Sequence, residues 1–117
     1  MNTATQTPAA VVVTPAVLAA FLAFCQGVVD THYATHFSNL TSDLLSVMKG
    51  RRYAKIVATR RGDHSTGRSV YCFVDMTNGD ILKSASWKAP AMHARGNVLD
   101  ASTYAAAITP YGAAYLT

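Results

Sequence analysis

The chain has 117 residues, half of them hydrophobic, and a formal net charge of +4. This length and apolar content predict one domain with one core and argue against a large multidomain protein. The chain contains no glutamate, four histidines and six scattered aspartates, so the groups that acid–base catalysis and metal binding require are scarce. We therefore predict no enzymatic activity, no metal site and no cofactor.

Residues 1–13, MNTATQTPAAVVV, carry no charge and no helix start. They predict a flexible or extended arm ahead of a single α+β domain over residues 14–117. The longest apolar run, residues 9–25, is interrupted by Thr14 and Pro15 and falls short of a membrane span. A secretory signal would need basic residues near Met1, and the first residues contain none. We expect a soluble, intracellular protein with no membrane partner.

A first helix is predicted from Thr14 onward. The Thr14 hydroxyl can cap free N–H groups, and Pro15 suits the first turn because that position needs no N–H donor. The apolar residues then recur every three or four positions, as on one helical face: Val17, Leu18, Phe21, Phe24, Cys25 and Val28. We expect this helix to reach about Asp30, with a continuation to His36 left open.

A second, shorter helix is predicted over residues 39–48. Its apolar residues line one helical face: Leu40, Leu44, Leu45 and Val47. Ser38 or Thr41 can cap its start, and Gly50 is placed to end it.

Three strands are predicted next, because the pattern changes at Tyr53. The segment YAKIVATR (53–60) is the first strand, RGDHSTG (61–67) is a loose loop, and RSVYCFVD (68–75) is the second strand. The pair Asn78-Gly79 is the strongest short hairpin signal in the chain, so the third strand is expected from Asp80 to Trp87.

A two-residue turn at Asn78-Gly79 would pair Thr77 with Asp80 and set the register of this hairpin. The resulting pairs are Val74 with Lys83, Cys72 with Ala85 and Val70 with Trp87. The side chains of Val70, Cys72, Val74 and Ala85 form an aliphatic face, which suits packing on the helices. This arrangement leaves Tyr71 and Phe73 together on the other face.

Beyond Trp87 the sequence predicts a loop, KAPAMHARG, and a short fourth strand over residues 97–99. A last helical turn would begin at Asp100 or Ser102 and end before Pro110. The predicted fold class is α+β, with two N-terminal helices followed by an antiparallel three- to four-stranded meander and a short C-terminal helix.

The charges are strongly segregated along the chain. All ten Lys and Arg residues lie between Lys49 and Arg95, where three aspartates oppose them, so this segment carries a net charge of +7. The rest of the chain carries −3. Clustered positive charge indicates an anionic partner, and a solvated basic sheet face is the alternative with the same composition.

The basic and aromatic strands predict a surface for nucleic acid. Rings two residues apart on one strand face can stack successive bases while nearby cations neutralise phosphates. The predicted rings are Tyr53, Tyr71, Phe73 and Trp87. The predicted phosphate contacts are Arg51, Arg52, Lys55, Arg60, Arg61, Arg68, Lys83, Lys88 and Arg95. The alternative for Tyr71 and Phe73 is a place in the core under a helix.

Two other groups of reactive residues give only weak support for a disulfide, a metal site or a catalytic triad. Cys25 and Cys72 lie in different predicted elements and form no C-x-x-C pair, which favours core thiols over a disulfide or a metal site. Asp63, His64 and Ser65 are adjacent in a predicted loop, where neighbouring side chains diverge and cannot form a catalytic triad.

His32 and His36 have the i, i+4 spacing of two zinc ligands on a helix. A third ligand is missing, since Asp30 would lie on a different face. A surface pair is therefore the favoured interpretation. No glycine-rich phosphate loop is present in the sequence.

A long pattern runs through the second half of the chain: R-S-V-x-x-F-[IV]-D, then G-D-[IV]-x-K-x-x-x-W-K-x-P-A-x-x-x-R-G, together with the closing YGAAYL. The residues that meet the pattern are Arg68, Ser69, Val70, Phe73, Val74, Asp75, Gly79, Asp80, Ile81, Lys83, Trp87, Lys88, Pro90, Ala91, Arg95 and Gly96. In this pattern the chain resembles a widespread group of small, uncharacterised phage proteins. The resemblance implies a phage context and no particular activity.

The sequence thus predicts a small, non-enzymatic phage protein that binds nucleic acid, single-stranded in preference, and acts in the cytoplasm of the infected host cell. The neutral arm and an exposed sheet edge favour a homo-oligomer. Two alternatives stay open. One is a virion component, and the other is a phage-encoded inhibitor of a host protein.

Overall fold

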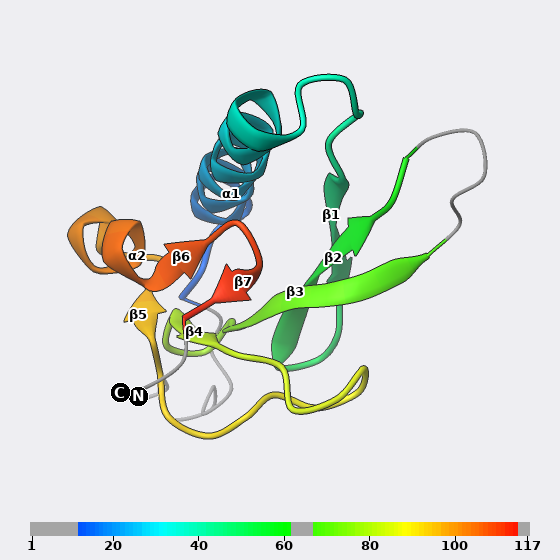
Figure 1. Cartoon of the computed structure of the whole chain (residues 1–117). Coiled ribbons are helices and arrows are strands. Elements are labelled where there is room, and N and C mark those ends of the chain that lie inside the picture. The colour runs from blue at the N-terminus through cyan, green and yellow to red at the C-terminus, as the bar shows by residue number, and fades with distance from the viewer. Residues whose placement is uncertain (1–11, 62–66, 115–117) are drawn as a thin grey trace, which may run out of the picture.

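The computed structural model describes residues 12–61 and 67–114 (Figure 1). A five-stranded antiparallel sheet has the strand order β1-β2-β3-β4-β5, and β6 and β7 form a separate hairpin. The elements in chain order are α1 (Pro15–His36), β1 (Leu44–Lys49), β2 (Tyr53–Thr59), β3 (Arg68–Asp75), β4 (Asp80–Leu82), β5 (Gly96–Asn97), α2 (Ala101–Ala107), β6 (Ile108–Thr109) and β7 (Gly112–Ala113). The α+β class with an antiparallel sheet is confirmed. The predicted three- to four-stranded meander is wrong, because β1 adds a fifth strand to the sheet.

Helix α1 begins where the sequence predicts. The Thr14 side chain accepts a hydrogen bond from the Val17 N–H (3.2 Å), and Pro15 occupies the first turn. The helix continues past Asp30 to His36. Its fully buried residues are Leu18, Phe21, Cys25 and Val29. They pack on the sheet, so the predicted apolar face is the one that forms the core.

The predicted second helix over residues 39–48 is wrong, and with it the predicted order of two N-terminal helices. Leu44–Lys49 is strand β1, paired with β2 from Leu44↔Thr59 to Lys49↔Ala54. Gln26 of α1 holds its start, because its Nε2 donates to the Asp43 carbonyl (2.9 Å) and its Oε1 accepts from the Leu45 N–H (2.8 Å). Gly50 stands in the β1–β2 turn instead of ending a helix.

The β3–β4 hairpin exists, but its turn is longer than predicted. Val74 pairs with Ile81 and Phe73 with Leu82, so four residues, 76–79, form the turn. The register is therefore shifted by two residues from the prediction. Gly79 in this turn has φ of 86°, the left-handed conformation for which glycine is favoured. Strand β4 ends at Leu82, and the predicted strand up to Trp87 is wrong beyond that residue.

A β-bulge separates the two rings that were predicted to share a face. Pairing between β2 and β3 runs to Ile56↔Cys72 and resumes at Val57↔Val70, which leaves Tyr71 as an extra residue. Tyr71 consequently joins Cys72 in the core under α1. Phe73 lies against Tyr53 and Lys55 outside this cluster. The prediction of an open two-ring platform is wrong, since both rings are buried.

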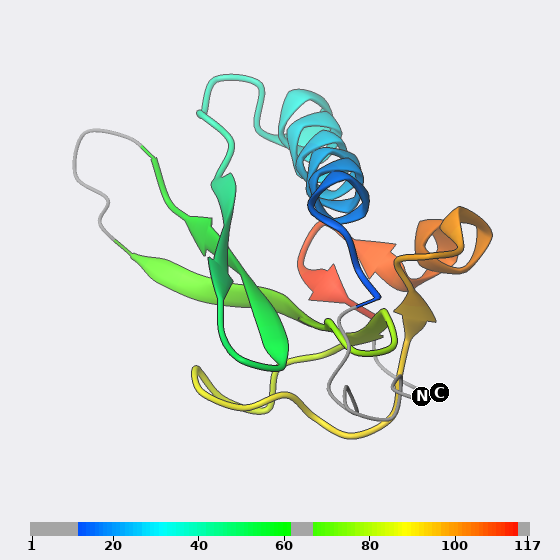
Figure 2. The ribbon, with the colours of Figure 1, turned by 180° about the vertical axis from the view of Figure 1, so that it is seen from behind.

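The sheet is covered on both sides. Helix α1 lies on one side, and residues 83–95 run along the other (Figures 1 and 2). The buried cluster under α1 includes residues of β1, β2 and β3, and Ile108 and Ala113 of the β6–β7 hairpin close it at one end. The core is therefore concentrated between α1 and the sheet.

The C-terminal elements confirm the predicted last helix and add an unpredicted hairpin. Asp100 caps α2 by accepting from the Ser102 N–H (3.0 Å). The β6–β7 hairpin then reaches β3, where the Tyr71 hydroxyl donates to the Thr109 carbonyl. Strand β5 is shorter than the predicted strand over residues 97–99.

The N-terminal part of the chain bears on two predictions, the arm over residues 1–13 and the absence of a membrane partner. Residues 1–11 of the predicted arm lie outside the described residues, whereas Val13 is buried and donates its N–H to the Met76 carbonyl (3.3 Å). By length and composition alone, α1 could cross a membrane, with a mean hydropathy of 1.3 over its most apolar window. The core helix of a soluble protein can have the same length and apolar composition.

The prediction of a homo-oligomer also stays a prediction. Strand β1 is at one edge of the five-stranded sheet. Its Leu44 and Met48 side chains are 45% and 44% exposed. An edge of this kind can pair with another chain.

Candidate nucleic-acid interface

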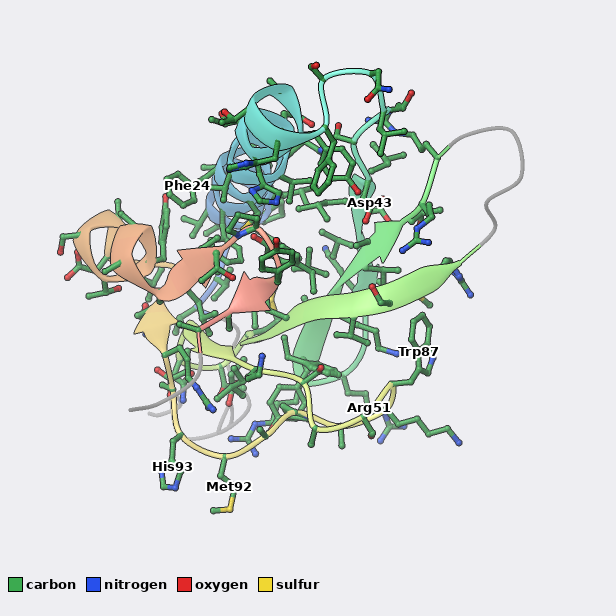
Figure 3. All side chains as sticks on the ribbon, in the orientation of Figure 1. Phe24, Asp43, Arg51, Trp87, Met92 and His93 are labelled. Carbon is green, nitrogen blue, oxygen red and sulfur yellow. The ribbon has the colours of Figure 1, made fainter. Side chains whose placement is uncertain are left out.

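A basic hollow of about 410 Å³ lies on the side of the sheet away from α1. We call it the basic groove and define it by its five cationic residues: Lys49, Arg51, Arg52, Lys55 and Lys88. Lys49 ends β1, the β1–β2 turn supplies Arg51 and Arg52, β2 supplies Lys55, and Lys88 comes from the segment that follows β4. Figure 3 shows Arg51 and Trp87 on this side, with Asp43 toward α1.

Four of the five cations in the basic groove are available to a ligand. Within residues 12–61 and 67–114, the sole ion pair joins Arg52 to Asp75, with Nη2 and Oδ2 2.9 Å apart. The remaining four therefore have no carboxylate partner among those residues. No acidic residue lines the groove, so its positive potential is not cancelled locally.

Asp75 ties the groove to the turn of the β3–β4 hairpin. Its Oδ1 accepts hydrogen bonds from the N–H (2.9 Å) and the hydroxyl (2.6 Å) of Thr77, and its Oδ2 accepts from Arg52 Nε (3.0 Å). Burial by itself would raise the pKa of Asp75. The hydrogen bonds from Thr77 and Arg52 outweigh that effect and lower the pKa below its usual value.

This lowered pKa predicts an acid-dependent loss of stability. Because the folded-state pKa lies below the unfolded one, the contribution of Asp75 is complete above about pH 4 and is lost as the pH falls through the folded-state pKa. Asp75→Asn should therefore cost about 1–2 kcal/mol at pH 7 and nothing well below pH 4. Urea unfolding of both proteins at several pH values measures this. An equal difference at pH 7 and at low pH would contradict it.

Trp87 is the most exposed aromatic ring at this site, with 38% of its surface exposed, whereas Tyr53 is half-buried. The Lys55 ammonium lies 4.1 Å from its ring centroid and 5.9 Å from that of Phe73. Arg68 Cζ lies 5.2 Å from the Trp87 centroid. Lys55 and Arg68 thus place two positive charges beside an accessible ring, which is the combination that single-strand binding requires.

The structure gathers some predicted site residues and separates others. Those brought together are Arg51, Arg52, Tyr53, Lys55, Phe73, Trp87, Lys88 and the adjoining Arg68. Arg61 is at the other end of β2, where its Nε donates to the Ser42 carbonyl (2.8 Å). Arg60 lines a different hollow, beside Asp43 and α1.

Lys83 and Arg95 have structural contacts away from the groove. Lys83 Nζ donates to the Ala113 carbonyl (3.3 Å), and Arg95 Nε donates to the Ala114 carbonyl (3.1 Å). Both therefore hold the C-terminal hairpin. Lys49 was not among the predicted phosphate contacts, although the run K-G-R-R already places three positive charges within four residues.

Among the remaining reactive residues, the two cysteines occupy the core positions that the sequence predicts. Cys25 and Cys72 are buried, free thiols, and burial raises the pKa of Cys25 to about 12 and that of Cys72 well above its usual value. The rings of His32 and His36 lie 4.7 Å apart on α1. No group of three or more metal-binding side chains occurs in the part of the chain that the structure describes. Asp63, His64 and Ser65 lie outside it.

Comparison with known proteins identifies a family and no activity. A family model described as a family of unknown function (DUF7717) matches residues 3–112. The match includes α1 and β1, which the phage-protein pattern does not cover. No curated protein and no solved structure is significantly similar to the chain.

Proposed function

Because this chain belongs to a family of unknown function, DUF7717, we propose its role from its surface: it binds single-stranded nucleic acid through the basic groove and Trp87. The observation that carries the proposal is the set of four cations without a carboxylate partner among the described residues, next to an exposed ring. Cations neutralise phosphates and release counterions, while the ring stacks on a base. The proposed role is binding and not catalysis.

The energetics favour a base over the cations that now contact Trp87. A cation–π contact at an exposed site contributes about 0.5–1 kcal/mol, whereas stacking of a base on an aromatic ring contributes about 1–3 kcal/mol. A base can therefore displace Lys55 or Arg68 from the ring. The displaced cation is then free to pair with the neighbouring phosphate.

The fluorescence of Trp87 tests the proposal directly, because it is the only tryptophan in the chain. Titration with oligo(dT) should quench it, and affinity should fall as salt rises. Four phosphate contacts predict a slope of log K against log[salt] of about −3 for a single strand. Unchanged fluorescence, or a slope near zero, would contradict the proposal, and tighter binding of a duplex would contradict the preference for single strands.

Two matched variants distinguish binding in the basic groove from a general effect of the net charge. Lys55→Gln removes one charge inside the groove and should weaken oligo(dT) binding and reduce the salt slope by about 0.7. Arg61→Gln removes the same charge at the other end of β2, where the side chain bonds the Ser42 carbonyl, and should leave binding nearly unchanged. Equal losses from both variants would indicate a nonspecific response to net charge.

The biological setting is part of the proposal. The resemblance of residues 68–96 to small phage proteins supports a role in the cytoplasm of an infected host cell. A protein that coats or protects single strands there would need a sequence-tolerant surface. Stacking and phosphate contacts provide such a surface, because every base has a ring face and every nucleotide a phosphate.

A further inference from the structure

A second hollow, of about 370 Å³, lies on the opposite side of the sheet from the basic groove. We call it the aromatic cleft. It is formed by the C-terminal half of α1, the segment before β1, the end of β2 with Arg60, the start of β3 and the β6–β7 turn. The residues that define it are His32, Tyr33, Phe37, Asp43, Arg60 and Tyr111. Its volume is at the lower end of the range for small-molecule sites, about 300–1,000 Å³.

One wall of the cleft is a continuous set of rings. The centroid of His32 lies 5.3 Å from that of Tyr111 and 5.7 Å from that of Phe37, and Tyr33 lies 5.5 Å from Phe37. His32 Nε2 and the Tyr111 hydroxyl are 3.1 Å apart. A wall of rings in mutual contact offers faces and edges on which a flat aromatic ligand can pack.

The Asp43 carboxylate is held in place and still has a free oxygen. Its backbone is fixed by Gln26, while its Oδ1 receives one long hydrogen bond, from the Tyr33 hydroxyl at 3.4 Å. No residue in the described ranges donates to Oδ2. Since no unbonded side-chain oxygen is buried within those ranges, Oδ2 faces solvent. Asp43 can therefore accept hydrogen bonds from a ligand.

Arg60 limits the kind of ligand that fits. Arg60 lines the same cleft. It forms no ion pair with Asp43 within 4 Å, since the Arg52–Asp75 pair is the one ion pair among the described residues. An organic cation would be attracted by Asp43 and repelled by Arg60. A ligand that carries hydrogen-bond donors at one end and an anionic group at the other matches both charges.

We propose that the aromatic cleft binds a guanine nucleotide, with the ring on the aromatic wall, its edge at Asp43 and its phosphate at Arg60. Guanine is favoured because its N1–H and N2–H₂ are two adjacent donors that suit the two oxygens of one carboxylate. Adenine and cytosine present one amino group, and uracil one N–H. The choice of a nucleotide rests on the proposed function, while the cleft itself is a separate site.

Calorimetric titration with GMP, AMP, CMP, UMP and ribose 5-phosphate tests the assignment. GMP should bind about tenfold or more tightly than the other nucleotides, as expected for one bidentate pair, and ribose 5-phosphate should not bind in the same range. Equal binding of all five compounds would mean that only the phosphate is recognised. Binding of choline in place of GMP would identify a cation site. Either result would overturn the proposal.

Two variants locate the contacts. Asp43→Asn should remove the preference for GMP, because the amide would present a donor to the donors of guanine. It keeps the backbone contact with Gln26, so the fold should be retained, and an unchanged melting temperature checks this. Arg60→Gln should weaken all four nucleotides by a similar factor. A GMP preference that survives Asp43→Asn would overturn the assignment.

One series of titrations distinguishes a free nucleotide from a nucleotide within a strand, and the aromatic cleft from the basic groove. An oligo(dT) with a single central dG should gain affinity in an Asp43-dependent manner if the ligand is part of a strand, and should gain none if the ligand is free GMP. Lys55→Gln should weaken oligo(dT) and leave GMP binding unchanged. GMP binding without any oligo(dT) binding would remove the proposed function and leave the cleft assignment in place.

Discussion

Replacing Phe73 by alanine should lower the free energy of unfolding by about 3–5 kcal/mol, because a buried ring is removed and a cavity is left. Phe73 is 2% exposed and lies against Tyr53 and under the Lys55 side chain. A domain of this size has a total stability of about 5–15 kcal/mol, so the variant should be close to unfolding. Urea unfolding followed by circular dichroism measures the change.

Trp87→Ala is the matched control for this loss of a ring. Trp87 is partly exposed and contacts Lys55 and Arg68 through cation–π geometry. Its removal should cost about 1 kcal/mol or less. The two variants should thus separate stability from binding, since only Trp87 is proposed to stack on a base. A small stability loss in Phe73→Ala would place that ring at the surface.

Replacing Gly112 by alanine should destabilise the fold by about 3 kcal/mol or more. Gly112 has φ of 119°, and an added Cβ would lie 2.2 Å from the Tyr71 carbonyl oxygen. Both the backbone conformation and the close approach of β7 to β3 therefore exclude a side chain. The Tyr71 hydroxyl bond to Thr109 should be lost as the β6–β7 hairpin moves away.

Gly27→Ala is the same substitution at a position where we expect it to increase stability. Gly27 is inside α1, and an added Cβ would meet no atom within 4 Å. Alanine should stabilise the helix there by about 0.5–1 kcal/mol. Thermal unfolding of both variants gives the comparison. If Gly112→Ala were tolerated within 1 kcal/mol, the β6–β7 hairpin could not pack on the β3 bulge as described.

The candidate site was only partly predictable. The segregation of charge placed a basic surface between Lys49 and Arg95, but not its members. Lys88 reaches the groove because the chain after β4 turns back along the sheet. Arg95, seven residues later, instead bonds the Ala114 carbonyl. The sequence pattern contains no local signal for this difference.

The aromatic cleft was not predicted at all. Asp43 and Arg60 are seventeen positions apart and were assigned to a helix and to a strand, while Tyr111 follows the last predicted helix. They meet because β1 pairs with β2 and the β6–β7 turn packs under the end of α1. Such a site depends on these two long-range contacts together.

The sequence by itself determined the elements whose stabilising contacts are local. Thr14 and Asp100 cap their helices through hydrogen bonds to residues two or three positions away. The bounds of β3 and most of β2 follow from a run of strand-forming residues between turn signals. These interactions need no distant partner, so a short stretch of sequence is enough to predict them.

Only the tertiary structure decided the state of residues 44–49 and the direction of Tyr71. Leu44–Lys49 has an apolar pattern compatible with helix or strand, and pairing with β2 together with the Gln26 contact selects the strand. The bulge at Tyr71 reverses the expected alternation because the β6–β7 hairpin binds its hydroxyl and closes over it. The deciding partners are 5 to 38 positions away. The Gln26 and Thr109 contacts, at 19 and 38 positions, lie beyond the reach of a local pattern.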